Sequence, residues 1–244
     1  KTTGSDATCL HAPSRGKGVE LKVFRPYDKV SIWEHATAMS QAHKIGARVF
    51  IWECMGLRPE YVEQLQHVWT NDDISTITNA HSDHEDLQGP TGRDVAEVIA
   101  GFIPHNSLAI TTEHEMAPIL RDQASRVNTP LVEVSSIDTE VIPRDLLARI
   151  SYNEHPSNVS LVMSMAEQLG IDPIESLILM ADCVTPDLGS LKTTPPMRHL
   201  GRFLLFTNGM SANQTTGLIS NWRRSGFDQH NPLERPDQFM VTII

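Results

Sequence analysis

Side chains that can ligate a metal crowd one stretch of the chain, residues 69–90. Residues 74–78 are rich in isoleucine and threonine, which predicts a short strand. The candidate ligands that follow this strand, before the Gly89-Pro90 break, are His81, Asp83, His84, Glu85 and Asp86. Imidazoles and carboxylates hold divalent metals, so the loop predicts a metal site or a combined phosphate and metal site. The alternative is a solvated acidic turn.

A second carboxylate, Glu53, ends an apolar run over residues 49–52. Such a run is typical of a parallel strand that is covered on both faces. Residues 59–69 predict the next helix, because Pro59 suits a first helical turn. The expected apolar face of that helix consists of Tyr61, Leu65 and Val68. Open α/β sheets bind ligands at the carboxyl ends of their strands, so Glu53 and the loop around His84 are expected to share a site.

The alternation of helix and strand patterns continues along the chain. Helices are predicted over residues 30–45, 91–100, 116–127, 159–169 and 173–181, and another begins at 218–222. Strands are predicted over residues 19–24, 107–110, 131–134, 203–206 and 239–244. In the helix over 30–45, Glu34 and His35 are expected at the surface. The residues at helical spacing that should pack on the sheet are Ile32, Ala36, Met39 and the Ala42-His43 pair. This order predicts an α/β fold with a mostly parallel sheet flanked by helices.

Composition narrows the choice of partner and compartment. Thirty acidic residues against 20 basic ones give a formal net charge of −10, which argues against nucleic acid as a partner. Cys9, Cys54 and Cys183 contain no CxxC pair, so neither a disulfide framework nor a thiolate zinc site is indicated. No apolar run approaches the roughly 18 residues of a membrane span, and no signal peptide is present. The chain itself is therefore expected to be soluble and cytoplasmic.

The two ends of the sequence suggest that it is the middle of a longer protein. It begins at Lys1 without a methionine and ends in the strand-like residues 239–244. The Gly16-Lys17 pair resembles part of a phosphate loop. That loop requires a glycine five residues before the pair and a serine or threonine after it, where His11 and Gly18 stand.

Six segments of the sequence form an ordered set of motifs. They are KTTGSDA at the start, ECMGLRPEY at 53–61, ITNAHSDHEDLQGPTGRDVAEVIAGFIP at 77–104, HPSNVSL at 155–161, TPDLG at 185–189 and NGMSANQ at 208–214. In this order they resemble the ligase subunit of poly-γ-glutamate synthase, which belongs to the Mur ligase superfamily. The resemblance covers essentially the whole chain.

The resemblance implies both a fold and a reaction. The fold is the Mur ligase central domain, which is P-loop NTPase-like, over residues 1–244; its phosphate loop and its carboxy-terminal domain would lie beyond the two ends. The reaction is ATP-dependent formation of γ-glutamyl amide bonds. A glutamyl carboxylate attacks the γ-phosphate of ATP, and an incoming amine takes the resulting acyl phosphate. The implied cofactors are ATP and Mg²⁺.

The resemblance also implies roles for individual residues. Glu53 and His84 would hold the Mg²⁺ that lies between the γ-phosphate and the acceptor carboxylate, where a cation offsets the repulsion of two anions. Asn158 would lie near the nucleotide. Lys192 would contact a phosphate where relatives carry an arginine. Asn213 lies where the family has a polar residue near the ribose.

Two departures from the family pattern concern other positions. Gln214 stands where the family commonly has an aspartate. No lysine lies between His84 and Pro104, so the carbamylated lysine that helps to hold magnesium in several Mur ligases has no counterpart here.

Each assigned residue also has a structural interpretation. Glu53 would pair with an arginine, and His84 would stabilise its turn. Asn158 would cap a helix. Lys192 would be an exposed lysine, and Asn213 a turn residue.

The sequence is also compatible with two other functions. A metal-dependent hydrolase could use a two-metal site built from His81, Asp83, His84 and Asp86, with zinc or manganese and without ATP. A non-catalytic scaffold would be a ligase-like domain that has lost its phosphate loop. For the ligase, the resemblance implies glutamate and a growing poly-γ-glutamate chain as substrates. It also implies small membrane subunits or a second copy as partners, at the cytoplasmic face of the cell membrane.

Overall fold

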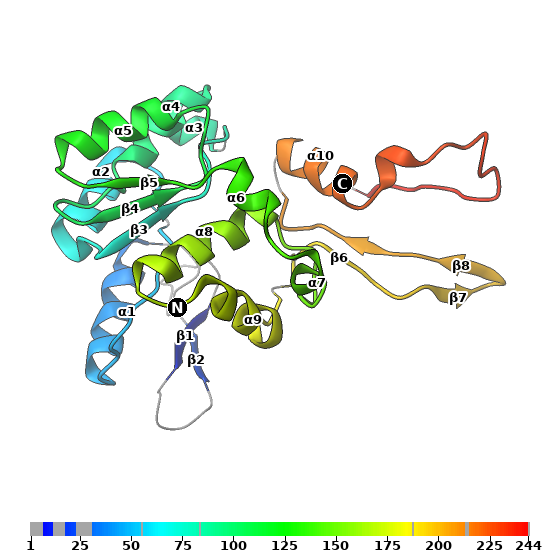
Figure 1. Ribbon diagram of the computed structural model, residues 1–244, viewed down its shortest axis with the longest axis horizontal. Helices are drawn as coiled ribbons and strands as arrows, with labels where there is room; N and C mark the ends of the chain where they lie inside the picture. The colour runs from blue at the N-terminus through cyan, green and yellow to red at the C-terminus, as the bar shows by residue number, and fades with distance from the viewer. Residues whose placement is uncertain are drawn as a thin grey trace. The chain divides into compact units, whose positions relative to one another are not determined.

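The computed structural model describes residues 7–11, 18–22, 31–54, 56–82, 84–186, 188–212 and 215–243 (Figure 1). The chain divides into two compact units, residues 1–109 with 113–132 and residues 110–112 with 133–244. β1 (Ala7–His11) and β2 (Gly18–Lys22) form an antiparallel hairpin. The strand predicted over 19–24 is confirmed for residues 19–22. Residues 23–24 and the Gly16-Lys17 pair lie outside the described residues.

The main sheet has three parallel strands in the order β3-β4-β5. They are β3 (Ile74–Ile77), β4 (Leu108–Thr111) and β5 (Leu131–Glu133). The connecting helices are α4 (Gly92–Ala100) between β3 and β4, and α5 (Ala117–Arg126) between β4 and β5. These two helices lie side by side along the sheet (Figure 1). The predicted α/β class, with a parallel sheet flanked by helices, is confirmed.

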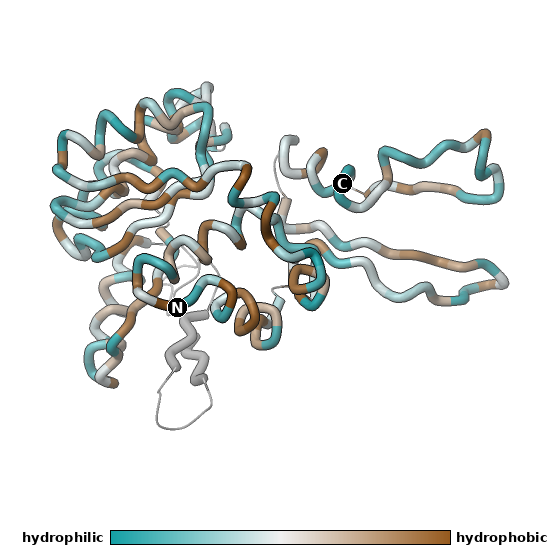
Figure 2. Tube along the Cα trace, viewed as in Figure 1, coloured by the Kyte–Doolittle hydropathy of each residue, from teal (hydrophilic) through white to brown (hydrophobic). Residues whose placement is uncertain are grey.

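A hydrophobic core joins this sheet to α4 and α5. Its buried side chains are Ile77, Ala100, Ile103, Ala109, Leu120, Ala124 and Val127. Figure 2 shows the strands of the sheet as largely hydrophobic segments, as expected for parallel strands under helices. Leu120 is fully buried, and burial of such a side chain stabilises the fold by roughly 1.5–3 kcal/mol.

The start of α4 is fixed by its own sequence. The Thr91 hydroxyl accepts from the Asp94 backbone N–H at 3.3 Å, and Asp94 Oδ2 accepts from the Thr91 backbone N–H at 3.0 Å. This capping box satisfies two N–H groups that no helical carbonyl can reach. The helix predicted over 91–100 therefore begins at its expected place.

The helix predicted over 30–45 is α1 (Trp33–Lys44), but its buried face differs from the expected one. The buried side chains are His35, Ala38 and Ala42. The expectation that His35 is exposed is wrong, because only 2% of the residue is exposed. Gly46, at φ +69°, follows the helix in the left-handed conformation that often ends helices.

The helix predicted over 59–69 changes type half-way. It begins as α2 (Pro59–Glu63) and continues as a π-helix, η2 (Gln64–Thr70). Its buried residues are Val62, Leu65 and Gln66. Tyr61 and Val68 are exposed, so the expected inward face is wrong except at Leu65. The wider π-turn changes the angular spacing of side chains that the 3.6-residue period assumes.

The strand predicted over residues 49–52 is wrong. Only Trp52 makes a bridge, and residues 49–51 are irregular. Val49 is 75% exposed and Ile51 is 62% exposed. Besides that single bridge, Trp52 is anchored through its side chain, since the indole N–H donates to Asp72 Oδ1 at 2.7 Å.

The second unit begins with a small helical core. Its helices are α6 (Ser136–Glu140), α7 (Arg144–Leu147), α8 (Pro156–Gln168) and α9 (Pro173–Cys183). The core residues are Ile142, Ile150, Val159, Leu177 and Ala181. The helices predicted over 159–169 and 173–181 are confirmed, and α6 and α7 were not predicted.

Short antiparallel pairs follow in the same unit. β6 (Lys192–Thr193) pairs with β9 (Thr207–Asn208), and β7 (Met197–His199) pairs with β8 (Arg202–Leu204). The chain continues with α10 (Thr215–Arg224) and the 3₁₀-turn η3 (Phe227–Gln229). The apolar strand predicted over 203–206 is confirmed for residues 203–204, which lie in β8, whereas residues 205–206 are irregular. Phe203 lies in a hairpin and is 80% exposed.

Two further observations concern the end of the chain and membranes. Residues 239–243 are irregular, so the strand predicted there is wrong; Ile244 lies outside the described residues. Among the described helices, none combines the length and apolarity needed to cross a membrane.

Candidate functional site

Glu53 is exposed and directly follows the anchored Trp52. The Trp52 ring stands edge-on to the His35 ring, with 5.3 Å between the ring centroids. Successive side chains of an extended segment point to opposite sides. Because Trp52 is held by Asp72 and His35, the Glu53 carboxylate is left on the solvent side.

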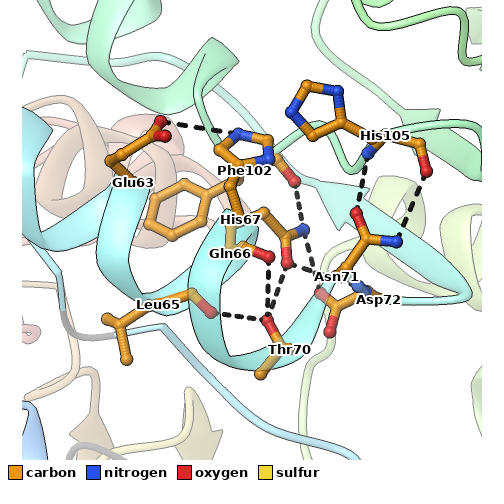
Figure 3. A network of polar contacts seen from close by, with 9 residues as sticks. All are labelled: Glu63, Leu65, Gln66, His67, Thr70, Asn71, Asp72, Phe102 and His105. Carbon is orange, nitrogen blue, oxygen red and sulfur yellow. Dashed lines mark hydrogen bonds and ion pairs between the residues drawn. The ribbon is translucent and has the colours of Figure 1, made fainter.

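Asp72 belongs to a polar network at the end of the π-helix (Figure 3). Gln66 is 0% exposed; it donates to the Phe102 carbonyl at 2.6 Å and to Asp72 Oδ2 at 3.2 Å. Gln66 Oε1 accepts from the Thr70 hydroxyl at 2.8 Å. Burial raises the pKa of Asp72, and the hydrogen bonds from Trp52 and Gln66 act against that shift. The network fixes the carboxylate that holds the segment before Glu53.

Burial also shifts the pKa values of Cys54 and His35, which lie close to Trp52 and Glu53. It raises the pKa of the Cys54 thiol to about 12, so Cys54 is neutral and unreactive at physiological pH. It lowers the pKa of His35, while the charges of Glu34 and Glu53 act in the opposite direction. His35 is therefore a neutral, structural side chain beside Glu53.

His84 lies in the loop at the carboxyl end of β3, and it is exposed. Its backbone is in the left-handed region, with φ +48°. Its carbonyl accepts from the N–H groups of Leu87 and Gln88, at 2.8 and 2.9 Å. These bonds close the first turn of α3 (Glu85–Gln88). The loop therefore ends in a helix turn that presents the His84 imidazole to solvent.

Of the other candidate ligands of the loop, the structure describes the side chains of only two, His81 and Asp86. His81 and Asp86 are exposed, and the His81 N–H donates to Asn79 Oδ1 at 3.1 Å. Asp83 and the Glu85 side chain lie outside the described part of the structure. Within the described part, no group of three or more His, Cys, Asp or Glu side chains is placed to hold a metal ion.

The donors that are present suit a Mg²⁺ ion that a nucleotide helps to bind. Mg²⁺ in proteins is held by one or two protein groups, with water and substrate phosphates as the remaining ligands. Glu53 offers the oxygen that Mg²⁺ prefers, and His84 offers an imidazole nitrogen; both are accessible.

The segments that carry the two residues are connected to different ends of β3. The segment of Glu53 is anchored through Asp72, which precedes β3, whereas His84 follows β3. That the two side chains hold one ion stays a prediction.

The candidates for nucleotide contact lie in the second unit. Asn158 is exposed in the first turn of α8, and its amide donates to Glu154 Oε1 at 3.0 Å. It is not the cap of that helix: the cap is His155, whose Nδ1 accepts from the Ser157 N–H at 3.3 Å. Asn213 lies outside the described residues.

Lys192 borders a surface pocket of this unit with a volume of about 420 Å³. Tyr152 and Asn153 also line the pocket. Arg224, which no sequence motif indicates, donates to Asn153 Oδ1 at 2.8 Å. Burial lowers the pKa of Arg224 and the charge of Glu154 raises it. A lysine on the pocket wall and an arginine bonded to Asn153 provide positive charge near the pocket.

Comparison with known proteins identifies relatives of the chain. No family model matches it. Over 227 residues it is 29% identical to PGA synthase CapB of Bacillus subtilis (strain 168). This match covers 92% of the chain and 55% of that protein. The chain is thus similar to CapB along most of its length. It is also 29% identical over 224 residues to the capsule biosynthesis protein CapB of Bacillus anthracis, covering 92% of the chain and 47% of the relative.

The match to CapB confirms the resemblance to poly-γ-glutamate synthase that the motifs indicated. The chain spans about half the length of these CapB proteins. The chain is similar in structure to a solved point mutant of L. casei FPGS, with a TM-score of 0.56 and 14% sequence identity. The superposition covers 81% of this chain and 53% of the FPGS chain. At this identity the likeness establishes the fold. The expected Mur ligase architecture, which folylpolyglutamate synthetase shares, is therefore confirmed.

Proposed function

We propose that the full-length protein is an ATP-dependent amide ligase that extends poly-γ-glutamate, and that residues 1–244 form part of its central ATPase domain. The observation that carries this proposal is the similarity to PGA synthase CapB along 92% of the chain. The α/β fold shared with a folylpolyglutamate synthetase supports it independently.

The proposed reaction has two steps. A glutamyl γ-carboxylate oxygen attacks the γ-phosphorus of ATP, and ADP leaves to give an acyl phosphate. The amino group of the next glutamate then attacks the acyl carbon; inorganic phosphate leaves, and the nitrogen loses a proton. Mg²⁺, when bound, supplies the positive charge that lets two anions approach.

Glu53 and His84 are proposed to hold that Mg²⁺. Both are exposed and lie in the first unit, so neither needs the fold to rearrange before a ligand reaches it. His84 stands at the carboxyl end of β3, the edge at which α/β sheets bind ligands. The carboxylate of Glu53 would supply negative charge to the ion, and the imidazole of His84 would supply a nitrogen ligand.

In the second unit, Lys192 is proposed to contact a nucleotide phosphate as a point charge. Its position at the 420 Å³ pocket supports this role. Asn158 is proposed to lie near the same nucleotide, where its exposed amide can donate and accept. Asn213 is retained as a proposed ribose contact from the family pattern.

The proposed substrates are glutamate and the growing poly-γ-glutamate chain. Small membrane subunits and a second copy of the chain are proposed as partners, at the cytoplasmic face of the membrane. These partners come from the resemblance, and the strongly acidic balance of −10 agrees with the absence of nucleic acid among them.

The direct test is incorporation of labelled glutamate into polymer by the purified full-length protein, with ATP and Mg²⁺. The expected result is polymer growth with one ADP and one phosphate released for each glutamate added. A metal-dependent hydrolase would instead cleave a substrate with zinc or manganese in the absence of ATP. A scaffold would release no ADP under any of these conditions, and either result would overturn the proposal.

A further inference from the structure

A buried carboxylate lies at the carboxyl end of β4, beside the loop that carries His84. Glu113 is 6% exposed. Its Oε2 accepts from the Ala80 N–H at 2.6 Å, and its Oε1 accepts from the Met116 N–H at 3.0 Å. One side chain thus joins the loop after β3 to the start of α5.

Ala80 is also held by packing. It is 3% exposed and shares a small buried cluster with Val95 and Ala96 of α4. A Cβ placed on Gly92 would lie 3.4 Å from the Ala80 carbonyl oxygen, so α4 begins against this part of the loop. Ala80 is therefore held by packing against α4 and by the hydrogen bond to Glu113, and the exposed part of the loop follows it.

The loop from Ala80 to His84 depends on the position of Ala80. Within the described part of this loop, His81 and His84 are exposed. The φ of +48° at His84 is uncommon for a residue other than glycine and persists where the surroundings impose it. A shift at Ala80 would therefore move the imidazole.

We propose that Glu113 is a positioning residue for His84: its carboxylate fixes Ala80 and thereby places the imidazole for metal binding. The inference rests on the proposed function, because it takes His84 as a ligand of the Mg²⁺ ion. Each carboxylate oxygen of Glu113 accepts from a backbone N–H group, Oε2 from Ala80 and Oε1 from Met116. A carboxylate satisfies both, whereas an amide has a single acceptor oxygen.

The test uses Glu113→Gln in the full-length protein and measures Mn²⁺ binding in the presence of ADP by electron paramagnetic resonance. The expected result is a rise of about 10- to 100-fold in the Mn²⁺ dissociation constant, the range found when groups that orient metal ligands are lost. Glu115→Gln makes the same change at an exposed neighbour, and it should bind Mn²⁺ as the wild type does. Glu113→Asp is a second variant, which keeps both oxygens on a shorter side chain.

His84→Ala, measured in parallel, separates the two ideas. If His84→Ala weakens Mn²⁺ binding and the Glu113 variants do not, the positioning role is overturned and the proposed metal site stands. If His84→Ala binds Mn²⁺ like the wild type, both the metal assignment and the positioning role are overturned. Loss of folding in both Glu113 variants would also overturn the role, because Glu113 would then determine the fold and not the ligand.

Discussion

The indole N–H of Trp52 donates to Asp72 Oδ1 at 2.7 Å, which ties the segment of Glu53 to the residues before β3. The same carboxylate accepts from the buried Gln66 amide. A candidate metal ligand is therefore held through its neighbour's side chain, without a strand. This arrangement leads to the first prediction.

Trp52→Phe keeps an aromatic ring but removes the indole N–H donor together with the five-membered ring that carries it. We expect a loss of about 1–3 kcal/mol in the free energy of unfolding, because Asp72 Oδ1 loses its partner in a partly buried place. Urea denaturation followed by circular dichroism measures this. Trp33→Phe is the matched control, since Trp33 is 67% exposed and its loss should cost about 0.5 kcal/mol or less. Equal stability of the two variants would contradict the prediction.

The second prediction concerns Gln66, whose amide joins Phe102, Thr70 and Asp72 (Figure 3). Gln66→Leu fills a similar volume without hydrogen bonds. It should destabilise the protein by roughly 2–4 kcal/mol, since the Phe102 carbonyl and Asp72 each lose a donor.

Gln64→Leu on the same π-helix is the control for this change, because Gln64 is only half-buried. Its urea midpoint should stay close to that of the wild type. A midpoint for Gln66→Leu as high as that of Gln64→Leu would show that the network contributes little.

The third prediction is a pH dependence of stability. Neither ring nitrogen of His35 has a hydrogen-bond partner among the described residues, and burial lowers the pKa of His35 from its ordinary 6.5. The unfolded chain then takes up a proton before the folded chain does. Stability from this group is therefore fully present above pH 6.5 and falls as the pH drops from 6.5 to the folded pKa.

His35→Phe removes this titration, so the free energy of unfolding should fall less between pH 7.5 and pH 5 than in the wild type. Glu34 and Glu53, whose charges raise the His35 pKa, remain in place. His43→Phe, at an exposed site of α1, should keep the wild-type slope. An unchanged slope in His35→Phe would refute the prediction.

The elements that were predicted correctly are determined by residues within the element or directly beside it. α4 follows from a capping box, Thr91 with Asp94, and α8 begins at Pro156, which suits a first helical turn. β3 alternates between core and solvent at Thr76 and Ile77. These signals lie within a few residues of the element, so the sequence alone can reveal them.

The elements and residues that were predicted wrongly or not identified depend on contacts between residues far apart in the sequence. The apolar run over 49–52 predicts burial, but pairing requires a neighbouring strand, and Trp52 is held by Asp72 instead. Gln66 is buried because a π-turn directs it to the Phe102 carbonyl. Glu113 was not identified as part of the site, since nothing near it in sequence indicates that it binds Ala80.

The claim that Glu53 and His84 hold one metal ion is tested most directly by a double-mutant cycle. Mn²⁺ binding with ADP is measured for Glu53→Gln, His84→Ala and the double variant of the full-length protein. If one ion uses both ligands, each single variant weakens binding, and the double variant loses clearly less than the sum of the two effects. Two independent effects that add fully, or wild-type binding in either single variant, would contradict the account.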